Sequence, residues 1–234
     1  MITFSGVTHA ILQPRGRQTI LRDYSGVLPK GAYVALAATD AARQELVRLC
    51  CGAAKPFRGR VAREGTVSWP IGQSNLFRSH LNGLATIRFF ASMYRFDADA
   101  VLRHVADFTQ ISEEMHHPTL TWPSPTLLKL SLTLALLPSF DAYVVNSSVL
   151  HPDPAFQQRW VAKFEERIED RLLIMATTQF AAVRRFCRSA LVAHEGSLFM
   201  TEDVINAVRC FGLRPDSLRR VTDEDDDDTI DEPV

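Results

Sequence analysis

The sequence has few cysteines, few lysines and no long hydrophobic run. Its four cysteines, Cys50, Cys51, Cys187 and Cys210, show no metal-ligand spacing, and the adjacent pair on a helix would point apart. We therefore expect buried, reduced thiols rather than a metal centre. The longest apolar block, at 127–137, is interrupted by polar residues and is shorter than the roughly 20 residues that cross a membrane. The first residues lack a basic segment, so we predict no signal peptide.

The composition is that of a globular domain with an uneven distribution of charge. The chain has 234 residues, 46% of them hydrophobic, which is enough for one sizeable core or a core with a small subdomain. Residues 223–232 hold eight of the 27 acidic residues and none of the 26 basic ones, so the remaining body has a net charge of +7. Such a body is compatible with nucleic acid, an anionic membrane face or an ordinary solvated surface. We expect no nucleic-acid partner.

Residues 31–53 are the segment around which the chain is organised. A short apolar run at 33–37 predicts a buried strand, and residues 41–51 carry hydrophobic side chains at helical spacing. A strand, a turn and a helix in this order are typical of the phosphate loop of nucleotide-binding proteins. Such a loop needs glycines, whose backbone N–H groups close around phosphate, together with a lysine and a hydroxyl for magnesium. The turn at 38–45 has no glycine, no lysine and no hydroxyl after it.

Apolar strands and amphipathic helices alternate along the rest of the chain. Further strands are predicted at 2–12, 19–28, 61–67, 140–145, 172–176, 189–193 and 197–200. Helices are predicted at 84–95, 97–108, 126–137, 153–171, 179–187 and 201–211, the last capped by Thr201. The buried strands among them predict an α/β fold with a parallel core sheet flanked by helices. We also expect an N-terminal antiparallel β part, a helical subdomain at about 73–138, and an acidic, disordered tail at 216–234.

Four short segments carry a resemblance to a known family. They are Pro29-Lys-Gly31, Ser68-Trp-Pro-Ile-Gly72, residues 140–145 and Phe186-Cys187. Together they resemble an ABC-transporter ATP-binding subunit of the type that serves capsule-polysaccharide export. The resemblance implies a P-loop-NTPase-like ABC nucleotide-binding domain for residues 1–215, with a membrane permease and possible second nucleotide-binding subunit, identical or different, as partners. It also implies a cytoplasmic protein, peripheral on the inner face of the membrane.

The ATP site implied by this resemblance departs from the family pattern in every catalytic motif. A carboxylate, Glu45, stands where a hydroxyl would meet magnesium and phosphate, and a buried anion there is repulsive. Asp153, at the D-loop, is the one residue retained. The replaced phosphate-loop positions are Ala38, Ala41 and Arg43 for glycines, Gln44 for the lysine, and Glu45 and Leu46 for hydroxyls.

Replacements also affect the other motifs that would touch the nucleotide. In the signature, the prolines on either side of Ser124 remove two backbone N–H donors. The replaced positions are Ile11 for the adenine-stacking aromatic, Arg78 for the glutamine that senses the γ-phosphate, Pro123, Ser124 and Pro125 for the signature, Asn146 and Ser147 for the magnesium aspartate and catalytic glutamate, and Thr178 for the switch histidine.

These replacements predict a pseudo-ATPase with a structural or regulatory role on the permease of a polysaccharide exporter. Each change alone is compatible with drift, but all of them fall on positions that touch one ligand. We predict no catalytic residue, no cofactor and no metal site; ATP with magnesium would bind only if the resemblance outweighed the losses. His116 and His117 do not suggest a metal, because adjacent side chains diverge. Two alternatives stay open: an active or weakly active ATPase, and a free regulatory protein that kept only the fold.

The surface that would face the permease still resembles the subfamily. Residues 72–95 would dock the permease's cytoplasmic coupling helix. A groove of this kind binds through a few apolar anchors ringed by polar contacts. The predicted docking residues are Arg88, Phe89, Phe90 and Arg95, and we expect one of the two phenylalanines to face the core.

Overall fold

The computed structural model describes residues 1–13, 16–73 and 77–211, so the predicted acidic tail lies outside the described part. It contains an antiparallel sheet with the strand order β2-β1-β4 and a six-stranded sheet with the order β5-β6-β7-β3-β8-β9. The strands are β1 Ile2–Gln13, β2 Gly16–Leu28, β3 Gly31–Ala37, β4 Arg58–Arg63, β5 Val67–Ile71, β6 Ala142–Asn146, β7 Leu172–Ala176, β8 Ser189–His194 and β9 Ser197–Thr201. The helices are α1 Asp40–Cys51, α2 Gly83–Tyr94, α3 Ala98–Thr109, α4 Ser124–Ala135, α5 Pro154–Ile168, α6 Phe180–Phe186 and α7 Val204–Cys210.

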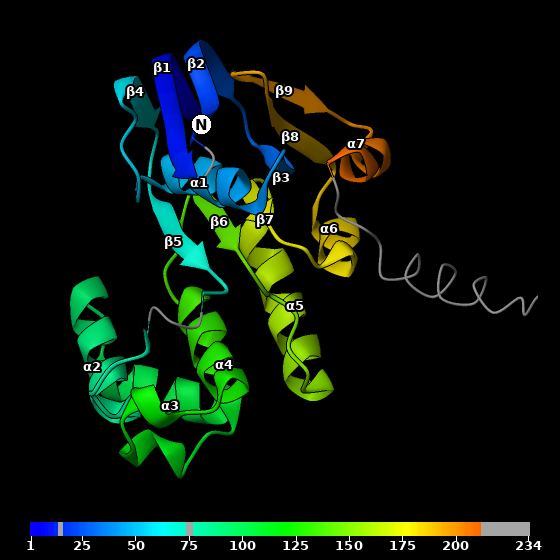
Figure 1. The fold of residues 1–234 in the computed structure, drawn as a ribbon. Helices are drawn as coiled ribbons and strands as arrows, with labels where there is room; N and C mark the ends of the chain where they lie inside the picture. Colours follow the sequence, from blue (N-terminus) through cyan, green and yellow to red (C-terminus); the bar gives the residue numbers. More distant parts are fainter. Residues whose placement is uncertain (14–15, 74–76, 212–234) are drawn as a thin grey trace, which may run out of the picture.

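The six-stranded sheet lies at the centre of the fold. Figure 1 shows it between the antiparallel sheet and the helices α2, α3 and α4. Strands β5, β6, β7, β3 and β8 run parallel, and β9 returns antiparallel to β8. One face packs on α5, α6 and α7, and the other on α1 and the antiparallel sheet. β6 and β7 are buried throughout, as central strands covered on both faces must be. The predicted α/β architecture is confirmed.

The region from residue 58 to residue 71 differs from the prediction. A single strand was expected at 61–67, whereas β4 and β5 are separate strands in different sheets. The chain turns between them at Gly65, which has a φ of 77° and where a Cβ would overlap the carboxylate of Asp141. That carboxylate accepts hydrogen bonds from the backbone N–H and the hydroxyl of Thr66 at 2.8 and 3.0 Å, which fixes the turn.

The Trp-Pro segment belongs to β5, an edge strand. Pro70 has no N–H to donate, and it is tolerated because β5 pairs with β6 alone among the described strands. The Ser68 hydroxyl accepts the N–H of Val144 at 2.8 Å, where the β5–β6 register is irregular. Trp69 joins the sheet to the helical subdomain. Its ring centroid lies 5.6 to 6.3 Å from those of Phe77, Phe90, Tyr94 and Phe140.

Helices α2, α3 and α4 form the predicted subdomain around a cluster of their own. Asn82 and Asp97 cap the first two of these helices through their side chains. Gly83 lets α2 approach the subdomain's tryptophan, since a Cβ there would lie 2.5 Å from the Trp122 ring. No helix in the described ranges is both long and apolar enough to cross a membrane.

Two smaller expectations are corrected by the structure. Thr201 is the last residue of β9, and the N-cap of α7 is Asp203, whose carboxylate accepts the N–H of Asn206 at 3.1 Å. The predicted helix began at residue 201, whereas α7 begins at Val204, so the residue in the N-cap position is Asp203. The thiols of Cys50 and Cys187 are buried as expected, but Cys210 is exposed at the end of α7.

Candidate functional site

The connection between β3 and α1 contains only two residues. β3 ends at Ala37, and α1 begins at Asp40. Thr39 is the N-cap, with extended backbone angles and a hydroxyl that accepts the N–H of Ala42 at 3.2 Å. A phosphate loop places about six residues, GxxxxG, between the strand and the lysine that precedes the helix. Here the residues that such a loop would contribute form the first turn of α1.

Arg43 lies buried beside this first turn. Its side chain is 7% exposed, and Nη2 donates to the carboxylate of Asp40 at 2.7 Å. Burial lowers the pKa of the Arg43 guanidinium, and the charge of Asp40 partly opposes that shift. Gln44, at the position assigned to the lysine, is exposed. The positive charge of Arg43 is therefore paired with a carboxylate of the same helix, Asp40.

The carboxylate of Glu45 contacts side chains on two elements. One carboxylate oxygen lies 2.9 Å from Nε2 of His9 on β1, and the other accepts Nη1 of Arg48 at 3.1 Å. His9 is buried and packs against Phe57 with ring centroids 4.7 Å apart. The carboxylate that stands at the hydroxyl position therefore forms a contact that joins α1 to the antiparallel sheet.

The ends of β6 and β7 bring three further replaced positions to the edge of the sheet where β3 also ends. Asn146, the last residue of β6, is buried, and its Nδ2 has no hydrogen-bond partner among the described residues. Ser147 has a φ of 113°, is exposed, and donates its N–H to the carbonyl of Ala176 at 3.0 Å. Thr178 follows β7 and is also exposed. These side chains share an edge because β7 lies between β6 and β3.

The signature positions 123–125, at the start of α4, and the D-loop residue Asp153, at the start of α5, are connected by hydrogen bonds and an ion pair. Pro123 is the N-cap of α4, and Pro125 lies in its first turn. His151 accepts the N–H of Asp153 at Nδ1, at 3.0 Å, so its proton is on Nε2, which donates to the carbonyl of Pro125 at 3.0 Å. Asp153 also caps α5 and pairs with Nζ of Lys129 at 2.6 Å. The start of α4 is thereby attached to the start of α5.

Both titratable groups of this attachment have shifted pKa values. The hydrogen bond from Lys129, helped by N–H groups of α5, lowers the pKa of Asp153 to about 2. Burial lowers the pKa of His151, and its bond to Pro125 opposes the shift. His151 is therefore neutral near neutral pH.

We expect the melting temperature to fall as the pH is lowered from about 7.5 to about 5, in part through His151. Its pKa in the fold lies below its unfolded value of roughly 6.5, so its stabilising contribution is complete above that pH and is lost as the pH falls. Protonation of Nδ1 breaks the contact with the N–H of Asp153. Thermal melts across this range should show a shallower pH dependence for His151→Gln. His117→Gln, on an exposed loop, is the control, and identical profiles for His151→Gln and the unmodified chain would contradict the assignment.

The remaining replaced positions lie on other elements. Ile11 on β1 is half-buried against the cluster beneath α1. Nη1 of Arg78 donates to the carbonyl of Leu120 at 2.9 Å, which ties it to the segment before α4. In residues 1–13, 16–73 and 77–211, no group of three or more histidine, cysteine, aspartate or glutamate side chains could hold a metal.

The outer face of α2 carries the proposed docking residues. Phe89 is 58% exposed, whereas Phe90 is 2% exposed and packs in the aromatic cluster around Trp69. Arg88 and Arg95 are exposed. A groove of about 180 Å³ lies beside Phe89, with Leu81 and Met93 among its exposed apolar lining residues. Phe89 is therefore the accessible aromatic anchor of this face.

Sequence comparison finds relatives over nearly the whole chain, although no family model matches. The chain is 26% identical over 216 residues to the capsule polysaccharide export ATP-binding protein CtrD of Neisseria meningitidis serogroup B, covering 92% of this chain and 100% of CtrD. It is 26% identical over 212 residues to the ATP-binding protein BexA of Haemophilus influenzae, covering 90% and 98%. It is 25% identical over 195 residues to the polysialic acid transport ATP-binding protein KpsT of Escherichia coli, covering 82% and 87%. The chain is a homologue of these ATP-binding proteins.

The fold of this chain is that of an ABC ATPase domain. A dimeric ATP-binding cassette in a post-hydrolysis state, bound to ADP and Pi, superposes with a TM-score of 0.66 and 12% identity, over 86% of this chain and 98% of that one. The ATP-binding subunit of an ABC transporter superposes with a TM-score of 0.63 and 17% identity, over 96% and 98%. The predicted family resemblance is confirmed.

Sequence reasoning missed three residues of the candidate site: His9, Lys129 and His151. Each contacts a residue more than 20 positions away or forms a backbone contact that sequence spacing does not reveal. Lys129 did leave a signal, because it interrupts an apolar block and a half-buried lysine usually requires a partner. That partner is the retained Asp153.

Proposed function

We propose that this chain is an ATP-binding-subunit-like component of a polysaccharide (capsule) export system that neither binds nor hydrolyses ATP and that acts structurally or as a regulator on the permease. The observation that carries the proposal is the two-residue connection between β3 and α1. The first turn of a capped helix occupies the place where a phosphate loop would present its ring of N–H groups. The names of CtrD, for capsule polysaccharide export, and of KpsT, for polysialic acid transport, support the export system.

The charges near this turn support the same proposal. Asp40 is 73% exposed at the N-terminus of α1, so a triphosphate would approach a carboxylate there. Glu45 is already engaged by His9 and Arg48 and offers no hydroxyl to magnesium. The signature helix starts with prolines in place of donors. In a pair with an intact subunit, neither composite ATP site would be complete.

We expect the purified chain to show no saturable binding of a fluorescent ATP analogue in the presence of magnesium, at physiological nucleotide concentration. The reason is the absence of a loop of free N–H groups after β3. Titration followed by fluorescence anisotropy measures this, with CtrD as the positive control for the assay. Saturable binding that ATP competes away would contradict the proposal, and turnover of ATP would favour the alternative of an unconventional ATPase.

The proposed partners are a membrane permease and a second nucleotide-binding subunit, identical or different. Such a chain would be cytoplasmic and held at the inner face of the membrane through its permease. The exposed Phe89 and the groove beside it give α2 the apolar anchor and polar rim of a docking face. Failure to co-purify with any permease would favour the free regulatory protein.

We expect Arg88→Glu and Arg95→Glu to weaken binding to the permease and to leave the melting temperature unchanged, because both side chains are exposed. Phe89→Ala should weaken binding more, by about 2 kcal/mol or more if it is a central anchor. Phe199→Ala, which removes a 55% exposed phenylalanine from β9, is the matched control. Co-purification with the permease and thermal melts measure the two effects. Full-strength binding by all three α2 variants would rule out docking through this face.

A further inference from the structure

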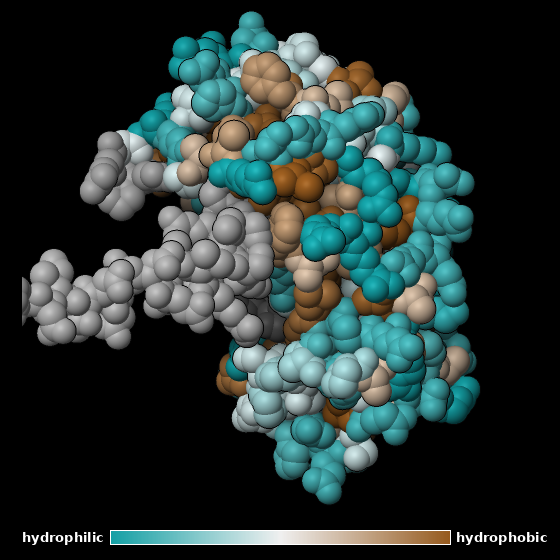
Figure 2. Space-filling view, turned by 90° about the vertical axis from the view of Figure 1, so that its right-hand side faces the viewer, coloured by the Kyte–Doolittle hydropathy of each residue, from teal (hydrophilic) through white to brown (hydrophobic). Residues whose placement is uncertain are grey.

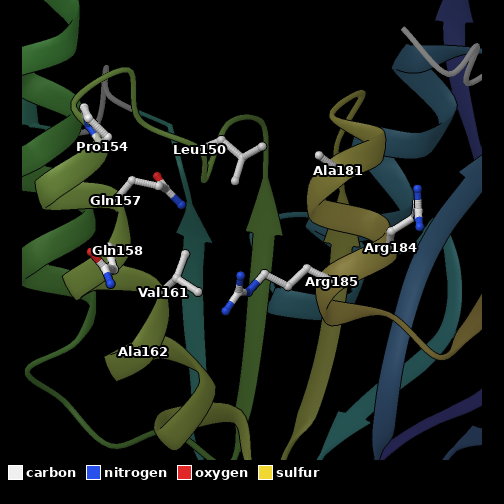
Figure 3. Close-up of a pocket in the computed structure, with 9 residues that line it drawn as sticks. All are labelled: Leu150, Pro154, Gln157, Gln158, Val161, Ala162, Ala181, Arg184 and Arg185. Carbon is white, nitrogen blue, oxygen red and sulfur yellow. The ribbon is translucent and has the colours of Figure 1, made fainter. Parts of the chain in front are cut away.

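A cleft of about 820 Å³ lies between α5 and α6, outside the ATP-site positions and the docking face (Figure 3). Its apolar lining includes Leu150, Val161 and Ala181. The polar side chains that line it are two arginines and two glutamines, and no carboxylate is among the lining residues in the described part of the chain. An occupant rich in hydrogen-bond acceptors and negative charge would complement such a cleft.

Two donors on opposite walls are directed toward this cleft. Figure 3 shows Arg185 extending from α6 toward α5, with the amide of Gln157 directed from α5 into the gap. The Nε2 of Gln157 is buried and has no hydrogen-bond partner among the described residues. Arg185 is paired with Glu165 at 2.8 Å, but both side chains are about half exposed, so this pair contributes little and leaves N–H groups for another acceptor. Arg184 is exposed and has no ion pair within the described chain.

The chain supplies an acidic segment of matching charge. Val208 of α7 belongs to the same hydrophobic cluster as Val183 and Phe186 of α6, so the described chain ends on the face of the sheet that also carries both arginines. The face that bears α6 and α7 is largely hydrophilic, with hydrophobic residues exposed through its middle (Figure 2). Residues 223–232 contain eight acids and no base. The 11 residues between the described chain and this segment, 212–222, would span up to about 40 Å when extended and roughly 20 Å as a flexible coil, which is comparable with the width of a small domain.

We propose that the acidic segment 223–232 docks in the α5–α6 cleft of its own chain. Its carboxylates accept hydrogen bonds from Arg185 and Gln157, while Arg184 adds positive charge at the rim. Because the segment is tethered, its effective concentration is of the order of millimolar, so weak contacts are sufficient. The cleft borders the loop that leads into α5, which includes Leu150 and lies next to the Asp153 cap.

Disulfide trapping in the full-length chain tests the proposal. Ala181→Cys in the cleft is combined with Thr229→Cys in the tail, in a background with Cys51→Ser and Cys210→Ser. The two remaining thiols do not compete, because burial raises the pKa values of Cys50 and Cys187 to about 12. The matched control combines Thr229→Cys with Ala100→Cys, an equally exposed position on α3.

The expected result is intramolecular disulfide formation several-fold faster for the cleft pair than for the control pair. Replacing Asp225–Asp228 by asparagine, or raising the salt concentration, should remove this difference, whereas Arg103→Glu on α3 should not. Equal rates for the two pairs, or a cleft rate that the asparagine substitutions leave unchanged, would overturn the proposal. A disulfide formed mainly between two molecules would also overturn it, in favour of docking in a second copy. Thermal melts verify that each variant is folded.

Discussion

Replacing Trp160 by alanine is expected to lower the free energy of unfolding by about 3–5 kcal/mol. Trp160 is fully buried in α5, and its ring stacks on Phe164 at a centroid distance of 4.5 Å. Its Nε1 donates to the carbonyl of Leu132 at 2.9 Å, in the last turn of α4. Carbonyl groups in the last turn of a helix lack intrahelical partners. Truncation therefore opens a cavity and also leaves a buried acceptor unpaired.

A second variant separates these two effects. Trp160→Phe keeps an aromatic ring and removes the indole N–H, so it should cost about 1–3 kcal/mol, mostly from the unpaired carbonyl of Leu132. Equilibrium urea unfolding of the three proteins measures the difference, with an unchanged m-value as the sign that only stability has changed. If Trp160→Ala and Trp160→Phe were equally destabilising, the cavity would contribute nothing and the packing argument would be wrong.

Replacing Gly72 by valine is expected to cost about 2–5 kcal/mol, by combining backbone strain with a steric clash. Gly72 has a φ of 92°, which side-chain-bearing residues rarely adopt. A Cβ at this position would overlap the backbone carbonyl oxygen of Ser148, in the segment that follows β6. Backbone atoms cannot move aside as the end of a flexible side chain does. The glycine of the Trp-Pro segment is therefore required by the approach of two backbones.

Gly6→Ala supplies the control for Gly72→Val. Gly6, in β1, has a φ of 57°, and a Cβ there would meet only Oδ1 of Asp23, at an ordinary contact distance of 3.5 Å. Gly6→Ala should therefore show the backbone strain alone, of about 1 kcal/mol. Urea unfolding of both variants measures the difference. A cost for Gly72→Val no larger than that of the control would show that the close approach to Ser148 is unimportant.

Secondary structure was predicted correctly where the local pattern of apolar residues matches their burial in the folded domain. β7 was predicted with its observed bounds, because a short run of apolar residues is what a central parallel strand requires. The strand expected at 61–67 is wrong because residues 64–66 form a turn between β4 and β5. Gly65 was the available signal, and its positive φ marks the change of sheet. Residues 68–71 were not predicted as part of a strand, because they contain Pro70 and proline is uncommon in strands. The structure places them in β5, at the edge of the six-stranded sheet, where a proline is tolerated.

The site was readable only in part. Spacing and resemblance placed the positions at the ends of β3, β6 and β7, and the parallel topology does bring them to one edge. The sequence did not reveal how those side chains are engaged. Glu45 pairs with His9 from 36 residues away, and Lys129 pairs with Asp153 from a different helix. Such contacts depend on how elements pack, which no local pattern encodes.

The short connection after β3 also bears on how such a chain could change over generations. A single substitution to glycine in the first turn of α1 would weaken the helix by about 1 kcal/mol while Thr39 still capped it. No ring of N–H groups would form until several residues left the helix together. Intermediates on that route would lose stability and gain no phosphate contact in return. Building a phosphate loop here one residue at a time would therefore lower the stability of the domain before it provided any phosphate contact.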